Sequence, residues 1–320
     1  MAKQESMVEI EGRQIKLSNL DKVLYPKAGF TKGHVLDYYA RIATVLIPHL
    51  SGRPLTLKRY PEGVEGLHFY EKNCPAYRPE WMKTAKIWSP GNNRFMYYCV
   101  VEDLPTLIWL ANLADLELHV SLSRAPEMQQ PTVIAFDLDP GAPANIVQCC
   151  QVAIWVRDIF AGFGLESFPK TSGSKGLQVY VPLNSKVTYE ETKPFARAIA
   201  RLLEDSHRDL VVSDMKKSLR SKDQPTVSTP VTWKEVETCL KKSDPELLVF
   251  TSEQTLKRVE KFGDLFEPVL KLTQKLPKLD ELRGLGAPTE MPLRPTKAKT
   301  ERVAVAAKSR ARPPRKRKSK

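Results

Sequence analysis

The sequence predicts an α+β fold built on a split β-α-β-β-α-β sheet. Residues 133–139 (VIAFDLD) begin as an apolar, β-favouring run of the kind that forms a buried strand. Residues 145–161 then show the apolar periodicity of an amphipathic helix, closed by glycines. Two strands and a helix are expected next, at 167–170, 177–183 and 189–204. The fourth strand of the unit is missing from the pattern, and Leu210–Ser213 is the nearby candidate.

Further elements on either side give this unit an N-terminal α/β extension and a helical continuation. The helices begin at residues suited to N-caps, and the strands alternate with turn-rich segments. Helices are expected at 32–47 with Thr31 as N-cap, at 104–114, after Thr232 and at 252–262, and strands at 55–60, 67–71 and 116–122.

Length and composition bound the class of protein. The chain has 320 residues, of which 42% are hydrophobic, enough for one large or two small domains. No apolar run approaches the roughly 18 residues that span a bilayer, and the polar N-terminus lacks the apolar centre of a signal peptide. The five cysteines are odd in number and form no C-x-x-C pair. A disulfide framework or a structural zinc site is therefore not expected, and a reducing cytoplasm is the expected location.

Positive charge is concentrated in the last part of the chain. Of the net charge of +13, residues 287–320 carry +10, from 12 Lys/Arg and 2 Glu, which leaves +3 for the rest. This segment is either a polyanion-binding arm or a solvated linker, and composition alone leaves both open. We expect a folded domain at 1–275 and a basic, disordered tail at 276–320.

The first candidate site lies at the end of the strand at 133–139. Side chains alternate along a strand, so Asp137 and Asp139 share one face while Phe136 and Leu138 point into the core. Two adjacent carboxylates suit a hard divalent cation such as Mg²⁺ or Mn²⁺, which phosphoryl transfer uses. The alternative is an Asx turn or a helix cap.

A second candidate site is the loop at 171–176 (TSGSKG). Its glycines permit positive φ and expose backbone amides, while Ser172, Ser174 and Lys175 add hydroxyls and a cation, so that the loop suits a phosphate. It is not a Walker A loop, because a strand follows rather than a helix. A flexible Ser/Gly hairpin is the alternative.

Basic and aromatic residues near the N-terminus form a third set. Lys22, Lys27 and Lys32 surround the start of a helix, which is either a phosphate site or ordinary surface. Phe69 and Tyr70 are adjacent in a strand, so one of them must face away from the core.

The outward aromatic residue, flanked by Lys58, Arg59 and Lys72, has the composition of a base-stacking site. The alternative is a core Phe69 beside a surface Tyr70. His119 stands alone in its strand, and such histidines are usually structural.

These motifs, in this order, resemble the polymerase domain of bacterial DNA ligase D, within the archaeo-eukaryotic primase superfamily. The resemblance covers roughly residues 10–270 and predicts a primase-like fold. It implies a domain that extends and fills DNA ends during non-homologous end joining, with Mn²⁺ or Mg²⁺ and often a preference for ribonucleotides. It is carried by LSNLDKVLYP, GFTKGHVLDYY, RPLTLKRYP, FYEKN, LELHV, FDLDPG, TSGSKGL, DLVVSDMKKSLR and PTVSTPVTW.

The resemblance also implies roles for individual residues. Asp137 and Asp139 become metal ligands, and Lys22 and Lys32 form a pocket for the 5′-phosphate of a broken end. Phe69 packs on the DNA, with Lys72 beside it. Residues expected to contact the incoming nucleotide are His119, Ser172, Ser174, Lys175, Gln178 and Arg220.

Two departures from the family pattern bear on activity. Gln178 stands where the second motif has a histidine, and glutamine cannot carry an imidazolium charge. The third motif, a strand with a further aspartate, is absent: Ser218-Leu219-Arg220 runs directly into SKDQPTVSTPV. The family has an S-L-R both before and after that strand, and Ser218-Leu219-Arg220 fits either copy. A deletion between the two copies would explain both this loss and the missing fourth strand. Asp214 is the nearest acid, but its context does not match.

The sequence therefore predicts a metal-dependent nucleotidyltransferase that acts on DNA ends and is impaired by the lost carboxylate. The alternatives are a non-catalytic module that binds 5′-phosphorylated ends, or a relic without function. Expected partners are DNA ends and nucleoside triphosphates, with Ku and a separate DNA ligase as candidates, because the chain holds no K-x-D-G ligase motif. The expected location is the bacterial cytoplasm, at the nucleoid.

Overall fold

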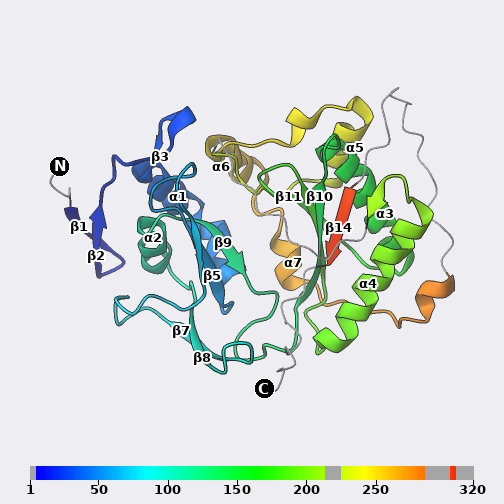
Figure 1. The fold of residues 1–320 in the computed structure, drawn as a ribbon, viewed down its shortest axis with the longest axis horizontal. Coiled ribbons are helices and arrows are strands. Elements are labelled where there is room, and N and C mark those ends of the chain that lie inside the picture. The colour runs from blue at the N-terminus through cyan, green and yellow to red at the C-terminus, as the bar shows by residue number, and fades with distance from the viewer. Residues whose placement is uncertain (1–4, 213–224, 285–302, 308–320) are drawn as a thin grey trace, which may run out of the picture. The chain divides into compact units, whose positions relative to one another are not determined.

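The computed structural model describes residues 5–212, 225–284 and 303–307 (Figure 1). Its described part divides into two compact units, one formed mainly by residues 5–128 and the other by residues 129–212, 226–284 and 303–307. No helix in these ranges is both long and apolar enough to cross a membrane.

The first unit is a strand-rich assembly with two helices. Thr31 caps the long helix α1 through a capping box with His34, as the sequence predicts. β5 pairs with β6, β8 and β9, and β8 pairs with β7, all antiparallel. The elements are β1 (Glu5–Ile10), β2 (Arg13–Ser18), β3 (Val23–Tyr25), β4 (Phe30–Thr31), α1 (Lys32–Leu50), β5 (Leu55–Arg59), β6 (Phe69–Glu71), β7 (Thr84–Ser89), β8 (Arg94–Cys99), α2 (Leu104–Asn112) and β9 (Asp115–Val120), with a 3₁₀ turn at Pro26–Ala28.

A disulfide in this unit corrects the sequence analysis. Cys74, in the loop after β6, is bonded to Cys99 at the end of β8, and both residues are buried. Counting cysteines did not reveal the pair, because an odd total without a C-x-x-C spacing says nothing about which residues the fold brings together. The remaining cysteines, Cys149, Cys150 and Cys239, are free and buried.

The second unit contains the predicted split β-α-β-β-α-β order. Its sheet has the strand order β11-β12-β10-β14-β13. The elements are β10 (Val133–Pro140), α3 (Ile146–Gly162), β11 (Phe168–Thr171), β12 (Leu177–Pro182), α4 (Tyr189–Ser206), β13 (Val211–Val212), α5 (Trp233–Lys242), α6 (Ser252–Phe262), α7 (Glu267–Lys271) and β14 (Val303–Ala307), with 3₁₀ turns at Pro245–Leu248 and Glu281–Gly284.

The core of this unit lies between the sheet and the helices α3 and α4, which are drawn beside β10 and β14 in Figure 1. Phe136 and Leu138 of β10 are fully buried, and so are Leu177 and Val179 of β12. Asn145 caps α3 through a capping box with Gln148. Because apolar side chains fill one face of β10, the alternation of the strand leaves its two aspartates on the other face.

The strand β14 is the main departure from the predicted fold. It lies between β10 and β13, antiparallel to the first and parallel to the second. Figure 1 shows β14 beside β10. The candidate strand at 210–213 is confirmed as β13, at Val211–Val212, but it pairs with β14 rather than with β10. The sequence analysis assigned residues 276–320 to a disordered tail. For residues 303–307 (VAVAA) this expectation is wrong, because the segment supplies a strand of the sheet.

Candidate active site

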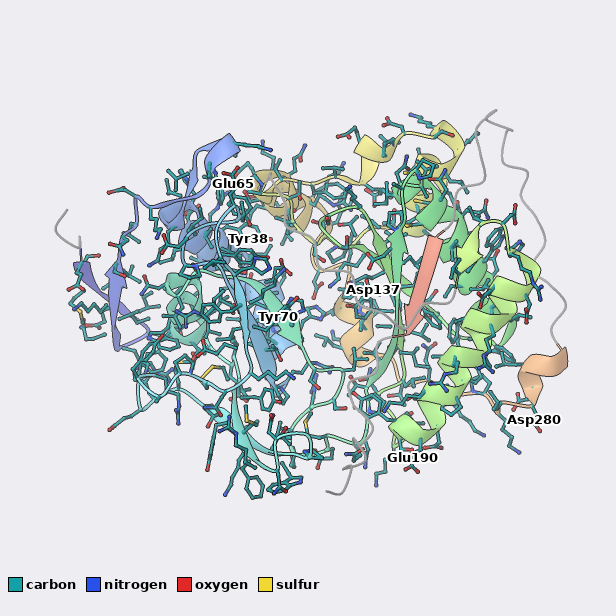
Figure 2. All side chains as sticks on the ribbon, in the orientation of Figure 1. Tyr38, Glu65, Tyr70, Asp137, Glu190 and Asp280 are labelled. Atoms are coloured by element: carbon teal, nitrogen blue, oxygen red, sulfur yellow. A yellow bond between two sulfur atoms is a disulfide. The ribbon has the colours of Figure 1, made fainter. Side chains whose placement is uncertain are left out.

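Asp137 and Asp139 lie on the face of β10 that points away from the apolar core (Asp137 is labelled in Figure 2). Asp137 stands opposite Gln178 in the β10–β12 register, and its Oδ1 accepts a 2.8 Å hydrogen bond from Gln178 Nε2. Gln178 Oε1 in turn accepts one from the hydroxyl of Tyr180 at 3.1 Å. Gln178, expected to contact a nucleotide, therefore orients a carboxylate in this structure.

The loop at 171–176 is a closed turn organised by Ser172. The Ser172 amide donates to the Gly176 carbonyl at 2.9 Å, and its hydroxyl oxygen accepts from the amides of Gly176 and Ser174 at 3.0 and 3.2 Å. Gly173 has a φ of +69°, a conformation that favours glycine. The side chains of Ser174 and Lys175 are exposed at the tip. The turn thus displays a hydroxyl and a cation while its backbone is held fixed.

Gly176 brings this loop against the carboxylates. A Cβ built at Gly176 would lie 2.4 Å from the Leu138 carbonyl oxygen and 3.0 Å from Asp139 Oδ1. Only glycine allows the loop backbone to approach β10 so closely. Two motifs about 30 residues apart, predicted independently from the sequence, therefore meet in one place.

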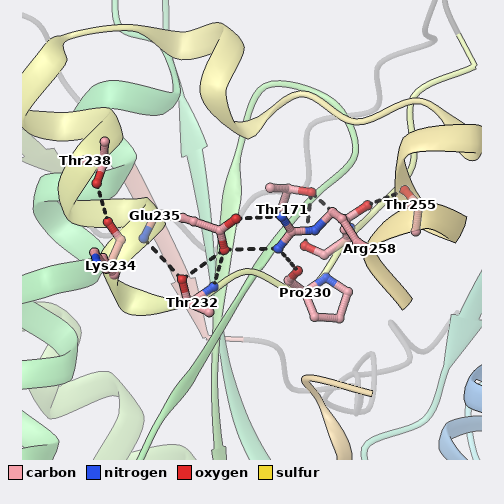
Figure 3. A network of polar contacts seen from close by, with 9 residues as sticks. Thr171, Pro230, Thr232, Lys234, Glu235, Thr238, Thr255 and Arg258 are labelled. Atoms are coloured by element: carbon pink, nitrogen blue, oxygen red, sulfur yellow. Dashed lines mark hydrogen bonds and ion pairs between the residues drawn. The ribbon is translucent and has the colours of Figure 1, made fainter. Parts of the chain in front are cut away.

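An extended segment at 226–231 braces the loop from its other side (Figure 3). The Thr171 amide donates to the Thr229 carbonyl at 2.9 Å, and the Thr229 amide donates back to Thr171 Oγ1 at 3.0 Å. The hydroxyl of Thr226 donates to the Gly173 carbonyl at 2.7 Å, which ties the brace to the loop itself.

An ion pair fixes the brace to two helices. The Arg258 guanidinium of α6 reaches both carboxylate oxygens of Glu235 in α5, at 2.5 and 3.0 Å, and donates to the Pro230 carbonyl at 3.2 Å (Figure 3). Burial alone would raise the pKa of Glu235, but the bonds from Arg258 and Thr232 hold it below its ordinary value. The sequence analysis missed this network, because its members come from three distant segments.

Within the part of the chain that the structure describes, no third carboxylate joins the pair in a metal-binding group. In the β10–β14 register, Ala306 stands opposite Asp137 and Ala304 opposite Asp139, and alanine has no ligand atom. Among the described residues, no three His, Cys, Asp or Glu side chains gather as a metal site. Arg220 and Asp214 lie outside the described residues.

A polar cluster in the first unit surrounds the predicted nucleotide residue His119. Glu117 Oε1 accepts from Lys58 Nζ at 2.8 Å and from the Tyr60 hydroxyl at 2.6 Å, while Glu117 Oε2 lies 3.1 Å from His119 Nε2. Burial alone would raise the pKa of Glu117, but the bonds from His119, Lys58 and Tyr60 hold it well below its ordinary range. His119 is therefore part of a charged network and not the solitary strand histidine that the sequence suggests.

The lysines predicted to bind a 5′-phosphate are held near each other at the start of α1. The Lys32 amide donates to the Lys22 carbonyl at 2.8 Å. Lys22 Nζ lies 3.1 Å from Glu62 Oε2, and the buried Lys32 Nζ donates to the Ser18 carbonyl at 2.5 Å. Burial, followed by the charges of Lys22 and Arg59, lowers the pKa of Lys32 to about 8.

The amides at the start of α1 already have partners. Those of Lys32, Gly33 and His34 donate to the carbonyls of Lys22 and Leu20 and to Thr31 Oγ1. The backbone amides of the helix N-terminus are therefore not available for a phosphate, and a phosphate bound here would contact the side chains of Lys22 and Lys32.

Both aromatic residues of β6 face outward. Phe69 and Tyr70 are 43% and 41% exposed, so an outward aromatic residue is present as expected, and the alternative of a core Phe69 is wrong. β6 is a three-residue strand at the edge of its sheet, which leaves both faces open. The Arg59 guanidinium lies 5.3 Å from the centre of the Phe69 ring, and Lys72 next to β6 is exposed.

Comparisons with known proteins agree with these motifs. The family model described as LigD, primase-polymerase domain, matches residues 31–223. LigD of Mycolicibacterium smegmatis, a multifunctional non-homologous end joining protein, is 36% identical over 282 residues, which are 80% of this chain and 36% of that protein. The bifunctional LigD of Bacillus subtilis is 30% identical over 275 residues, 78% of this chain and 43% of that protein.

A solved structure matches over most of its length. The polymerase domain of Mycobacterium tuberculosis ligase D in complex with DNA gives a TM-score of 0.73 at 34% identity, covering 81% of this chain and 99% of that one. The chain spans less than half of the full-length relatives. With its carboxylate strand and its serine- and lysine-bearing loop in contact, the chain belongs to the LigD primase-polymerase domain family.

Proposed function

We propose that this chain is a DNA-end-directed nucleotidyltransferase of the end-joining type, a template-dependent polymerase that fills gaps and extends ends. One observation carries the proposal: in a member of this family, the loop at 171–176 approaches β10 so closely at Gly176 that an added Cβ would lie 3.0 Å from Asp139 Oδ1. A site for a divalent cation and a site for phosphates then adjoin, which is what transfer of a nucleotide from a triphosphate requires.

The donor set of this site fits a hard divalent cation. Asp137 and Asp139 supply carboxylate oxygens, the ligand type that Mn²⁺ and Mg²⁺ prefer, from one face of one strand. Gln178 holds Asp137 through Oδ1 and so limits the orientations of that carboxylate. A bound ion would supply charge neutralisation for the triphosphate and activation of the attacking hydroxyl.

Other residues are assigned to the two substrates. Lys175 and the hydroxyls of Ser172 and Ser174 bind triphosphate oxygens, because charge-assisted bonds to phosphate are the stronger class. His119 and Arg220 are assigned to the incoming nucleotide on the family resemblance. Lys22 and Lys32 bind the 5′-phosphate of the DNA end, and Phe69 and Lys72 contact the DNA beside it.

Extension by this chain is expected to be slow. A two-metal displacement holds its ions from more than one side, and the strand beside β10 offers alanines in place of a third carboxylate. The loss of one ligand from such a site costs a few kcal/mol of transition-state stabilisation, on the order of a hundredfold in rate.

Primer extension on a gapped duplex with Mn²⁺ tests the proposal. Weak extension by the unmodified chain should vanish in Asp137→Ala and in Asp139→Ala. Asp205→Ala, which removes an exposed carboxylate that pairs with Arg208 on the surface, is the matched control and should extend as the unmodified chain does. Robust extension would contradict the impairment, and equal extension by all four proteins would contradict the assignment of the site.

A non-catalytic module that binds 5′-phosphorylated DNA ends is the second candidate, favoured by the alanines opposite the aspartates. If it is correct, gapped DNA is bound with no extension above the Asp137→Ala background. Affinity should then be higher for a 5′-phosphate than for a 5′-hydroxyl, and a double change of Lys22 and Lys32 to alanine should remove the difference.

The remaining partners follow from the same assignment. Ku and a separate DNA ligase are proposed as partners in end joining, and the bacterial cytoplasm, at the nucleoid, as the location. The location now rests on the family resemblance alone, because the disulfide between Cys74 and Cys99 removes the reason drawn from the cysteines. Co-purification of tagged protein after DNA breakage is the direct measurement. Recovery of neither protein would contradict this part of the proposal.

A further inference from the structure

Glu117 joins three side chains of the first unit, Lys58, Tyr60 and His119, in a single cluster. Glu117 and His119 are two residues apart on β9 and therefore share a face of that strand. Glu117 stands opposite Lys58 in the β5–β9 register, and His119 stands opposite Thr56. The cluster thus follows from the strand pairing itself and does not depend on a flexible loop.

The two oxygens of Glu117 have different tasks. Oε1 accepts from Lys58 and from Tyr60, and Oε2 is left to His119. The Lys58 side chain is only 3% exposed, so its cation needs a counter-charge within the protein, which Glu117 provides. The same contacts keep Glu117 ionised, as its lowered pKa indicates.

An ionised carboxylate can only accept hydrogen bonds. The contact of 3.1 Å between Glu117 Oε2 and His119 Nε2 therefore requires the proton on Nε2, and Nδ1 is the ring nitrogen that Glu117 does not engage. The ring of Tyr70 lies edge-on to the His119 ring, with 5.4 Å between their centroids (Tyr70 is labelled in Figure 2). The imidazole is thus bounded on one side by a charge and on another by an aromatic ring.

We propose that Glu117 is a positioning residue for the nucleotide site: it fixes the ring orientation and tautomer of His119, and the buried Lys58 holds Glu117 in place. The inference rests on the proposed function for its consequence, namely that His119 presents Nδ1 to the incoming nucleotide. A merely structural Glu117 would stabilise the unit without controlling which nitrogen of His119 faces a ligand.

The first experiment needs no nucleotide. Ring ¹⁵N shifts of His119, assigned with His119→Gln, report which nitrogen carries the proton. We expect the Nε2-protonated form in the unmodified chain and a mixture of tautomers in Glu117→Gln. Tyr60→Phe is the matched control, because it removes one bond to Oε1 and leaves both Oε2 and the charge intact. It should lower thermal stability without changing the tautomer. An unchanged tautomer in Glu117→Gln would overturn the proposal, even if that variant is less stable.

The second experiment measures binding of a nucleoside triphosphate with Mn²⁺ in a double-mutant cycle. Glu117→Gln and His119→Gln should each raise Kd by about five- to tenfold, and the double variant should be no weaker than His119→Gln alone, because one change acts through the other. Tyr60→Phe should stay within about twofold of the parent. Additive losses would overturn the positioning role. If the parent binds no nucleotide, the proposed function fails, while the tautomer measurement still decides whether Glu117 positions the ring.

Discussion

Lys32 is the buried member of the lysine pair at the start of α1. Its ammonium, with a pKa of about 8, is charged at neutral pH and loses its proton well before an ordinary lysine, whose value is 10.5. We expect the preference for 5′-phosphorylated over 5′-hydroxyl ends to be full near pH 7 and to fall between about pH 7.5 and 9.5. Fluorescence anisotropy with recessed duplexes at constant ionic strength measures it.

A loss of folded protein at high pH would not explain a fall in the preference for 5′-phosphorylated ends. Between about pH 8 and 10.5 the folded chain binds fewer protons at Lys32 than the unfolded chain does, so the contribution of this group to stability rises with pH in that window. Lys32→Arg keeps its charge throughout and should show no decline. A decline of equal size in that variant would assign the effect to another group.

Thr226 gives a second test at the scale of one residue. Its hydroxyl bond to the Gly173 carbonyl ties the brace to the loop that carries Ser174 and Lys175. Thr226→Val keeps the shape and removes this bond, which should cost about 1 kcal/mol of stability and weaken triphosphate binding several-fold. Isothermal titration and thermal unfolding measure the two effects.

The control for Thr226 lies in the same network. Thr238→Val removes a similar hydroxyl bond, to the Lys234 carbonyl at 2.6 Å within α5 (Figure 3), and leaves the bond from Thr226 to Gly173 intact. Stability should fall slightly in this variant, while nucleotide affinity stays at the parental value. Equal losses of affinity in both variants would mean that the brace does not position the loop.

For single residues, the sequence predicted which face of a strand a side chain occupies, because side chains alternate along a strand. Asp137 and Asp139 share a face because Phe136 and Leu138 are buried between them. The same rule places Glu117 and His119, which are two residues apart, on one face of their strand. The spacing of these two residues in the sequence therefore already indicates that they lie together. By contrast, the bond from Gln178 to Asp137 depends on the register between β10 and β12, which no local pattern specifies.

Among the elements, β14 shows most clearly the difference between what a local sequence pattern predicts and what depends on distant parts of the chain. Helices with N-caps were predicted nearly to the residue, as for α1 after Thr31 and α6 at Ser252–Phe262. VAVAA has strand propensity, but it lies between lysine- and proline-rich segments that predict a tail. Its place in the sheet depends on pairing with β10 and β13, which are distant in the sequence, and no pattern within the segment specifies such partners.

Truncation tests what β14 contributes to stability. A chain that ends at residue 302 differs from one that ends at residue 307 only by this strand. Its removal leaves backbone groups of β10 and β13 without their partners. We expect a loss of about 2 kcal/mol or more, a fall in Tm of roughly 4–8 °C. Calorimetry measures it, with hydrogen exchange at 135–139 as a local readout. Identical Tm values for the two chains would show that the strand is dispensable.

For the whole molecule, charge is distributed very unevenly. Residues 308–320 lie outside the described residues, and their sequence contains eight Lys or Arg. If they bind DNA, removing them should flatten the dependence of log affinity on log salt by up to about seven units, because each neutralised phosphate releases counterions. Binding titrations from low to moderate salt measure the slope.

A length-matched variant with these eight residues changed to glutamine separates charge from length. It should behave like the truncation if the arm contacts phosphates. An unchanged slope in both proteins would make the segment a linker, the other reading that composition leaves open. The chain that ends at residue 307 keeps β14, so stability does not confound the comparison.

The central place of β14 also sets an order of events during synthesis. Asp139 and Ala304 are neighbours in the sheet but lie 165 residues apart in the sequence, whereas β10 and β12 are made in quick succession. Closure over such a separation is slow. A nascent chain that has reached Gly284 contains β10, β11, β12 and β13, yet it lacks the strand that joins β13 to the rest. Until residue 307 emerges, one edge of β10 stays open to other chains, and this is the interval in which a chaperone would serve the protein most.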